Sequence, residues 1–104
     1  MAIPHAGKGE VVSLPRLGGT ERSTAIVKTD QFEAIHLVVP AGSTIPSHSV
    51  AGQATFQCLN GRIRLSFGES AVVLEAGDWL YLDRADEHAV EGLEDSALLL
   101  TILF

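Results

Sequence analysis

Apolar and polar residues alternate along much of the chain, in short segments separated by turn residues. The clearest segment is QATFQCL, residues 53–59, in which Ala54, Phe56 and Cys58 share one side. A period of two places alternate side chains on opposite faces of a β-strand. These three side chains are therefore predicted to face a core, and the polar residues between them to face outward.

The segment RIRLSF, residues 62–67, continues the alternation, with both arginines outward and Ile63 and Leu65 inward. Asn60-Gly61 separates it from the preceding segment. Both central residues of a type I′ turn need a positive φ, so Asn-Gly between two alternating runs is a strong hairpin signal. The pattern predicts that the two segments pair with each other as a β-hairpin.

The rest of the chain has the same character of short apolar runs between turn signals. The predicted strands lie near residues 10–14, 24–28, 32–39, 70–74, 79–82, 88–91 and 97–103. A helix over residues 23–39 is the competing prediction, and the β-branched residues of that stretch argue against it. Nine short strands without a linker or repeat predict an all-β sandwich or barrel.

Composition limits the protein to one domain and excludes several classes of partner. The 104 residues, 46% of them hydrophobic, suffice for one core, and residues 1–104 are expected to form one domain. A net charge of −6 opposes binding to nucleic acid or to anionic membranes. A single cysteine excludes an internal disulfide, and the longest apolar run is too short to span a bilayer. We expect a cytoplasmic protein.

Two histidines are the first candidates for chemistry, because a neutral imidazole binds metals and titrates near physiological pH. His48 follows the loop AGSTIPS, and His88 follows the loop DRADE. Each histidine lies just before or at the start of a predicted strand. The two loops are therefore the candidate site-forming segments.

The spacing of these histidines among glycines resembles the two motifs of the cupin family. The first motif, G-x5-H-x-H-x3,4-E-x6-G, is matched by Gly42, His48 and Gly61, and the second, G-x5-P-x-G-x2-H-x3-N, by Gly77 and His88. The resemblance implies a cupin double-stranded β-helix, which is a jelly-roll barrel. In that arrangement the motif region covers residues 42–92, N-terminal strands cover 10–39, and a C-terminal strand covers 97–103.

The chain departs from the family at residues that bind metal there. Val50 stands at the position of the second histidine, and Ala54 or Thr55 at that of the glutamate. Family members use three histidines and a glutamate to hold one divalent ion, commonly iron, manganese, zinc or nickel. With only His48 and His88 left as metal ligands, we expect such an ion to be bound weakly or to be absent.

Two further residues are candidates for replacement ligands. Cys58 shares the predicted inward face with Ala54, although a lone cysteine among apolar residues is more typical of an inert core thiol. His36 lies in FEAIHLVV, a run without clear alternation, and is more typical of a surface or hydrogen-bonded histidine. Both residues stay open as replacement ligands, with a structural role as the favoured interpretation of each.

The resemblance implies a ligand pocket inside the barrel, and three functions remain open. Its expected lining is Ala54, Phe56, Cys58, His48 and His88. One function is a metal-dependent enzyme of dioxygenase or isomerase type. A second is a metal-free acid and base enzyme similar to sugar epimerases, with His48 or His88 as base and Tyr81 as acid. The third is a non-catalytic module that binds a small apolar or carboxylated molecule.

The last strand and the aromatic segment predict a second copy of the chain as partner. Leu98, Leu100 and Ile102 can fill the barrel, which leaves Leu99, Leu103 and Phe104 in need of cover. Trp79 and Tyr81 alternate with two leucines, so one of these pairs faces outward. Small cupins commonly form homodimers, and the resemblance implies the same here.

Overall fold

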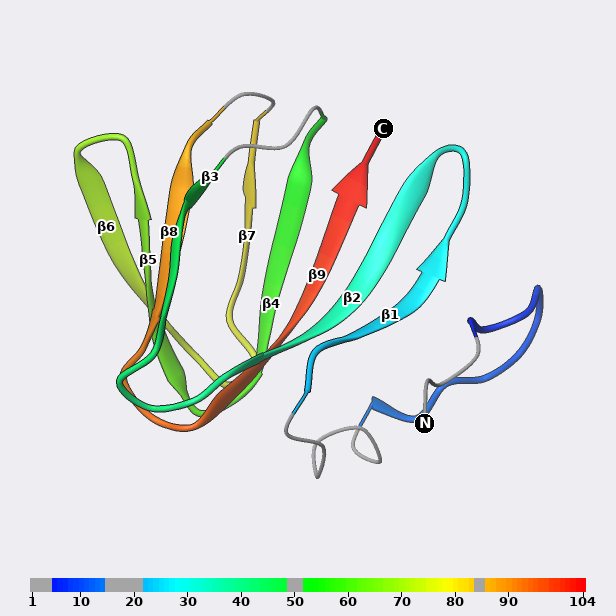
Figure 1. Ribbon diagram of the computed structural model, residues 1–104, viewed down its shortest axis with the longest axis horizontal. Coiled ribbons are helices and arrows are strands. Elements are labelled where there is room, and N and C mark those ends of the chain that lie inside the picture. Colours follow the sequence, from blue (N-terminus) through cyan, green and yellow to red (C-terminus); the bar gives the residue numbers. More distant parts are fainter. Residues whose placement is uncertain (1–4, 15–21, 49–51, 84–85) are drawn as a thin grey trace.

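The computed structural model describes residues 5–14, 22–48, 52–83 and 86–104, with Ser47 and His48 described by their backbone alone. Within these residues, nine strands form two sheets that face each other (Figure 1). The strands are β1 (Thr24–Lys28), β2 (Phe32–Val39), β3 (Thr44–His48), β4 (Ala54–Asn60), β5 (Arg62–Phe67), β6 (Ser70–Glu75), β7 (Trp79–Leu82), β8 (His88–Gly92) and β9 (Ser96–Leu103). The all-β prediction is confirmed, and residues 23–39 form no helix.

The chain winds back and forth between the two sheets. The five-stranded sheet has the order β1-β2-β9-β4-β7, and the four-stranded sheet has the order β3-β8-β5-β6. All neighbouring strands in both sheets are antiparallel. From β2 onward, successive strands mostly alternate between the sheets, which is the winding of a double-stranded β-helix. None of the described residues lies in a helix long and apolar enough to cross a membrane.

The core lies between the sheets and follows the predicted alternation. Ala54, Phe56 and Cys58 are buried on the inner face of β4, and Ile63 and Leu65 on the inner face of β5. Burying a side chain the size of phenylalanine or leucine contributes roughly 1.5–3 kcal/mol to stability. The period-two pattern therefore identified the residues that hold the two sheets together.

The predicted Asn60-Gly61 hairpin is wrong, because the chain changes sheets at this point. β4 pairs with β7 and β9, whereas β5 pairs with β6 and β8. Gly61 does have the positive φ of a tight turn, 80°. The dipeptide signalled a local reversal of the backbone, but that signal carries no information about which strands then exchange hydrogen bonds.

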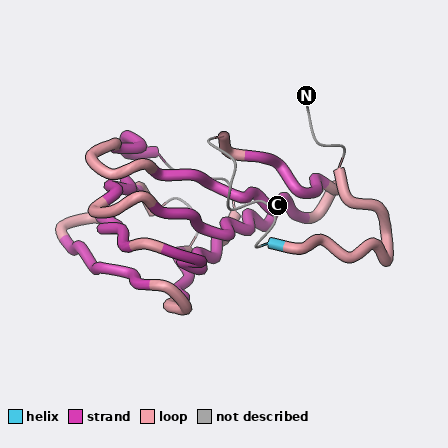
Figure 2. Tube along the Cα trace, turned by 90° about the horizontal axis from the view of Figure 1, so that it is seen from below, coloured by secondary structure: helices cyan, strands magenta, loops and turns pink. Residues whose placement is uncertain are grey.

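Two other strand predictions need correction. Residues 10–14 form no strand; the described N-terminal segment extends away from the sheets (Figure 2), and its Ala6 N–H donates to the Ile26 carbonyl oxygen at 2.8 Å. Conversely, β3 lies in a segment for which the sequence predicts a loop, because Pro46 has no N–H for a sheet ladder. As the outermost strand of its sheet, with an irregular register between Ile45 and His48, β3 tolerates the proline.

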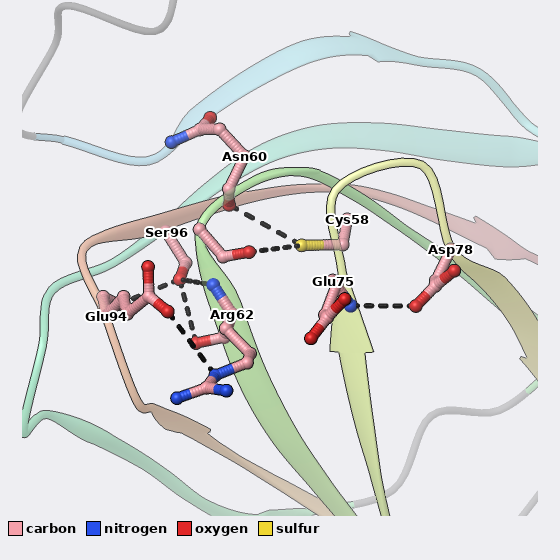
Figure 3. A network of polar contacts seen from close by, with 8 residues as sticks. Cys58, Asn60, Arg62, Glu75, Asp78, Glu94 and Ser96 are labelled. Atoms are coloured by element: carbon pink, nitrogen blue, oxygen red, sulfur yellow. Dashed lines mark hydrogen bonds and ion pairs between the residues drawn. The ribbon is translucent and has the colours of Figure 1, made fainter.

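A network of polar contacts closes the end of the barrel at which the chain passes from β4 to β5 (Figure 3). The buried Ser96 hydroxyl accepts the Arg62 N–H at 2.9 Å and lies 3.0 Å from the Arg62 carbonyl oxygen, to which it can donate. Arg62 Nε also lies 3.4 Å from the Glu94 carboxylate, in an exposed ion pair that contributes little. The serine thereby ties the start of β9 to the start of β5.

Candidate functional site

The opposite end of the barrel is where inward-facing side chains remain partly exposed to solvent. The β5–β6 turn, the start of β8 and the end of β9 all lie at this end, at the top of Figure 1. Val72 lies across from the buried Leu65 and shares its inner face, yet 37% of it is exposed. Phe67 and Ile102 pack against the core and are only half-buried. We call the end lined by Phe67, Val72 and Ile102 the mouth.

Among the described side chains on the inner faces near the mouth, the polar one is His88. It is the first residue of β8, its register partner on β5 is Phe67, and only 2% of it is exposed. Its ring contacts Phe56 of the facing sheet edge-on, with centroids 5.2 Å apart and planes at 77°. The imidazole therefore bridges the two sheets immediately beneath the mouth.

The backbone fixes which nitrogen of His88 carries the proton. Nδ1 lies 3.2 Å from the carbonyl oxygen of Asp86. A carbonyl oxygen only accepts hydrogen bonds, so Nδ1 must donate, and in the neutral ring Nε2 then holds the lone pair. Nε2 is thus the nitrogen that can accept a proton or a metal ion, while Nδ1 orients the ring.

His48 is the last residue of β3, and the β3–β8 register sets its Cα opposite that of His88. The topology thus brings the backbones of the two predicted site histidines side by side, although 40 residues separate them in the chain. The side chain of His48 lies outside the described part of the structure, as does Val50. A joint role of the two imidazoles stays a prediction.

Cys58 is buried on the inner face of β4, but toward the closed end of the barrel. Its thiol lies 3.5 Å from the Asn60 carbonyl oxygen, to which it donates. Burial raises the pKa of this thiol, and the negative charge of Asp78 raises it further. Because the thiolate is the form that ligates metals, these surroundings favour the inert core thiol over a ligand.

The role of Tyr81 as an acid inside the barrel is wrong. The register pairs Tyr81 with Thr55 and Trp79 with Gln57, on the face of β4 opposite to Ala54 and Phe56. Tyr81 is 58% exposed and Trp79 57%, whereas Leu82 is buried. The two leucines of β7 face the core, and the two aromatic residues lie on the outer face of the five-stranded sheet.

The described side chains do not fit the divalent ion that cupins usually hold. Ala54, at the position of the family's glutamate, is buried on the inner face and offers only a methyl group. The described residues contain no group of three or more histidine, cysteine or acidic side chains that could hold a metal. His88 is the one imidazole described on the inner faces, so the described donors there fall short of the three or four that a stable site requires.

His36 differs most from its sequence-based interpretation. It is neither exposed nor hydrogen-bonded: only 1% of it is exposed, and among the described residues neither ring nitrogen has a hydrogen-bond partner. The sequence pattern around His36 did not predict its burial, because the residues on both sides of it are also largely apolar.

The family model for the cupin domain matches residues 35–104, more than half of the chain. The chain belongs to the cupin family. Two solved structures align with this cupin over nearly its whole length. A conserved protein of unknown function from Streptococcus pyogenes has a TM-score of 0.82 and 18% identity, over 99% of this chain and 94% of that one. A cupin superfamily protein from Desulfitobacterium hafniense has a TM-score of 0.83 and 17% identity, over 100% and 99% of the two chains.

A third structure confirms the architecture by its description. It is an RmlC-like cupin family protein with a double-stranded β-helix fold from Methanocaldococcus jannaschii, with a TM-score of 0.74 and 13% identity, over 82% of this chain and 83% of that one. No protein of curated function matches the chain. At these identities the structural matches establish the fold of this cupin and leave its activity to its own residues.

Proposed function

We propose that this cupin binds a small molecule with an apolar body and a carboxylate group at the mouth of the barrel, and that His88 is its polar contact. The observation that carries the proposal is the fixed, buried imidazole of His88, held by the Asp86 carbonyl and by the edge of Phe56. A protonated imidazole donates N–H to a carboxylate, and the contact of Nδ1 with Asp86 keeps the ring oriented. A charge-assisted hydrogen bond of this kind is roughly twice as strong as a neutral one.

The apolar part of the ligand follows from the inner faces around His88. Those that the structure describes carry hydrocarbon side chains: Ala54, Phe56, Leu65, Leu82 and Val90. A mostly apolar lining with a few orienting polar groups is the usual composition of a small-molecule site. Acid and base catalysis would need a second polar group beside the first. Tyr81 is on the outer face, and His48, whose Cα lies opposite that of His88, is described by its backbone alone. The proposal is therefore one of binding.

A thermal-shift screen of small carboxylates tests this function. A ligand at a hundred times its Kd adds about 2.7 kcal/mol to the stability of the folded state. For a domain of about this size we expect a rise of roughly 10–20 °C, at about 4–8 °C per kcal/mol. His88→Phe, which fills the space without an Nε2, should lose the shift, while exposed His5→Gln should retain it.

Two outcomes would contradict the proposal. A carboxylate that stabilises His88→Phe as much as the wild type would show that the imidazole is not the contact. A melting shift produced by iron, manganese, zinc or nickel alone, with one metal per chain in the purified protein, would favour a metal-dependent enzyme.

We further propose that a second copy of the chain covers the outer face of the five-stranded sheet. On this face the register aligns uncharged side chains across β7, β4 and β9, namely Trp79, Tyr81, Thr55, Gln57, Leu99 and Thr101. The chain carries a net charge of −6, so two copies of it repel each other. Contact between two uncharged patches adds no further repulsion. Leu103 and Phe104, also exposed, extend the apolar area.

We expect the wild type to elute at twice the 11.0 kDa mass of one chain, and Tyr81→Glu to elute as a monomer, because it buries a charge in the proposed interface. Val73→Glu is the matched control, since Val73 is exposed on the outer face of the other sheet. Size-exclusion chromatography with light scattering measures all three. A monomeric wild type, or an equal effect of the two glutamates, would rule out this interface.

A further inference from the structure

His36 lies on the outer face of the five-stranded sheet, outside the core between the sheets. Its strand neighbours Ile35 and Leu37 pack against the core, so the side chain between them points the other way. On β9 its register partner is Leu99, which likewise alternates with the buried Leu98 and Leu100. The imidazole is nevertheless almost completely buried, at 1% exposure.

The described side chains that flank the ring on this face carry no charge, and the polar one among them is Thr24. Among the described residues neither Nδ1 nor Nε2 has a hydrogen-bond partner. The side chains that flank it on this face are Thr24 of β1, Leu99 of β9, and Ala34 and Val38 of β2 itself, none of them charged. Burial lowers the pKa of His36 for this reason, since the charged form loses its hydration without gaining a partner.

The strand beside His36 is only partly buried and pairs irregularly with its neighbour. β1 is an edge strand, none of its five residues is fully buried, and its register with β2 is broken between Ala25 and Val27. In the described residues before it, the Ser23 hydroxyl accepts the Val38 N–H at 3.0 Å, and further toward the N-terminus the Ala6 N–H donates to the Ile26 carbonyl oxygen. Segments with little apolar burial open at a lower free energy than the global unfolding of the domain.

We propose that His36 makes the docking of β1 on β2 sensitive to acid, so that β1 and the N-terminal segment detach from the sheet as the pH falls below neutrality. Opening of β1 removes Thr24 from its place opposite His36 and admits water, which solvates the imidazolium. Closing requires the neutral ring. The inference does not depend on the proposed ligand. His36 lies on the outer face of the five-stranded sheet, whereas His88 lies on the inner face of the four-stranded sheet.

The direction of the pH effect follows from the two protonation states. Above about pH 6.5, the ordinary pKa of histidine, the ring is neutral whether β1 is closed or open, and the closed state keeps its full stability. Below that pH the open state binds a proton that the closed state excludes. The ratio of open to closed molecules then rises by up to about tenfold for each pH unit, until the pH reaches the lowered pKa of the closed state.

Amide hydrogen exchange of the full chain tests the proposal at pH values from 7.5 to 4.5, with opening constants corrected for the intrinsic exchange rate. We expect the opening constant of the β1 amides to rise by up to about fivefold between pH 6.5 and 5.5, while the β5 amides stay unchanged. His36→Leu should remove the pH dependence in β1. His5→Gln, a substitution of an exposed histidine, should preserve it.

A second measurement keeps the proposal testable if His36→Leu does not fold. The imidazole resonances of wild-type protein should show His36 still neutral below pH 6.5, the ordinary pKa of histidine. The proposal is overturned if His36 titrates near pH 6.5 while β1 stays protected. It is equally overturned if β1 opening in the wild type does not depend on pH, or depends on it equally in His36→Leu.

Discussion

Gly61→Ala is expected to prevent the chain from folding stably, with a loss above about 4 kcal/mol in the free energy of unfolding. A Cβ at this position would overlap the Ser96 hydroxyl and the Asp95 carbonyl oxygen, and it would lie 2.8 Å from the Ser96 Cα. The φ of 80° adds about 1–2 kcal/mol for any residue with a Cβ. Domains of this size are stable by only about 5–15 kcal/mol, so denaturant unfolding should show most of that stability gone.

Gly77→Ala is the control that separates crowding from backbone strain. Gly77 has a φ of 92°, also in the left-handed region, but a Cβ at this position would meet no other atom within 4 Å. It should lose about 1–2 kcal/mol, the conformational cost alone. Equal losses at the two glycines would mean that the passage from β4 to β5 can relax, and would contradict the tight packing of Ser96 against Gly61.

Most of the fold could be predicted because the sheets bury one face of each strand. The alternation in β4 and β5 is a direct record of that burial, so their inward residues could be read from the sequence. The predictions that were wrong depend on contacts between segments far apart in the sequence. Asn60-Gly61 specified a turn without specifying which strands pair across it, and the β-branched residues near Val11 formed no strand in the described structure.

The site was predictable to a lesser extent, and for a different reason. The resemblance of the glycine and histidine spacing to the cupin motifs singled out His88, which the structure places on the inner face at the start of β8; its role as a site residue stays a prediction. The sequence did not decide which way Tyr81 points, since the alternation in β7 separates two faces but does not indicate which of them faces the core. The burial of His36 left no signal in the sequence, because the residues on both sides of it are also largely apolar.

One departure from the family's motif has a structural cause that the sequence did not reveal. Gly92 occupies the position of the motif's asparagine, and a Cβ there would overlap the Pro40 carbonyl oxygen. Its N–H donates to the Ser43 carbonyl at 3.0 Å, and its own carbonyl accepts the Gly42 N–H at 2.8 Å. The end of β8 is therefore held by backbone contacts too close for a side chain, and the departure concerns packing and not ligand chemistry.

Phe56→Ala is expected to have the second largest effect, a loss of about 3–5 kcal/mol in the free energy of unfolding. Phe56 is among the largest fully buried side chains, and it holds the facing sheet through the edge of the His88 ring. Phe67→Ala makes the same chemical change at a half-buried inward position and should cost less, because solvent already reaches that side chain. Urea unfolding of the two variants measures the difference.

A double-mutant cycle between Phe56→Ala and His88→Ala then links the core to the proposed site. If the edge-on contact is formed in solution, the two losses should fall short of additivity by about 0.5–1.5 kcal/mol, the usual strength of an aromatic pair beyond its burial. Phe56→Ala should also weaken carboxylate binding, because the His88 ring loses one of the two contacts that orient it. Additive losses with unchanged ligand binding would mean that Phe56 stabilises the barrel without positioning His88.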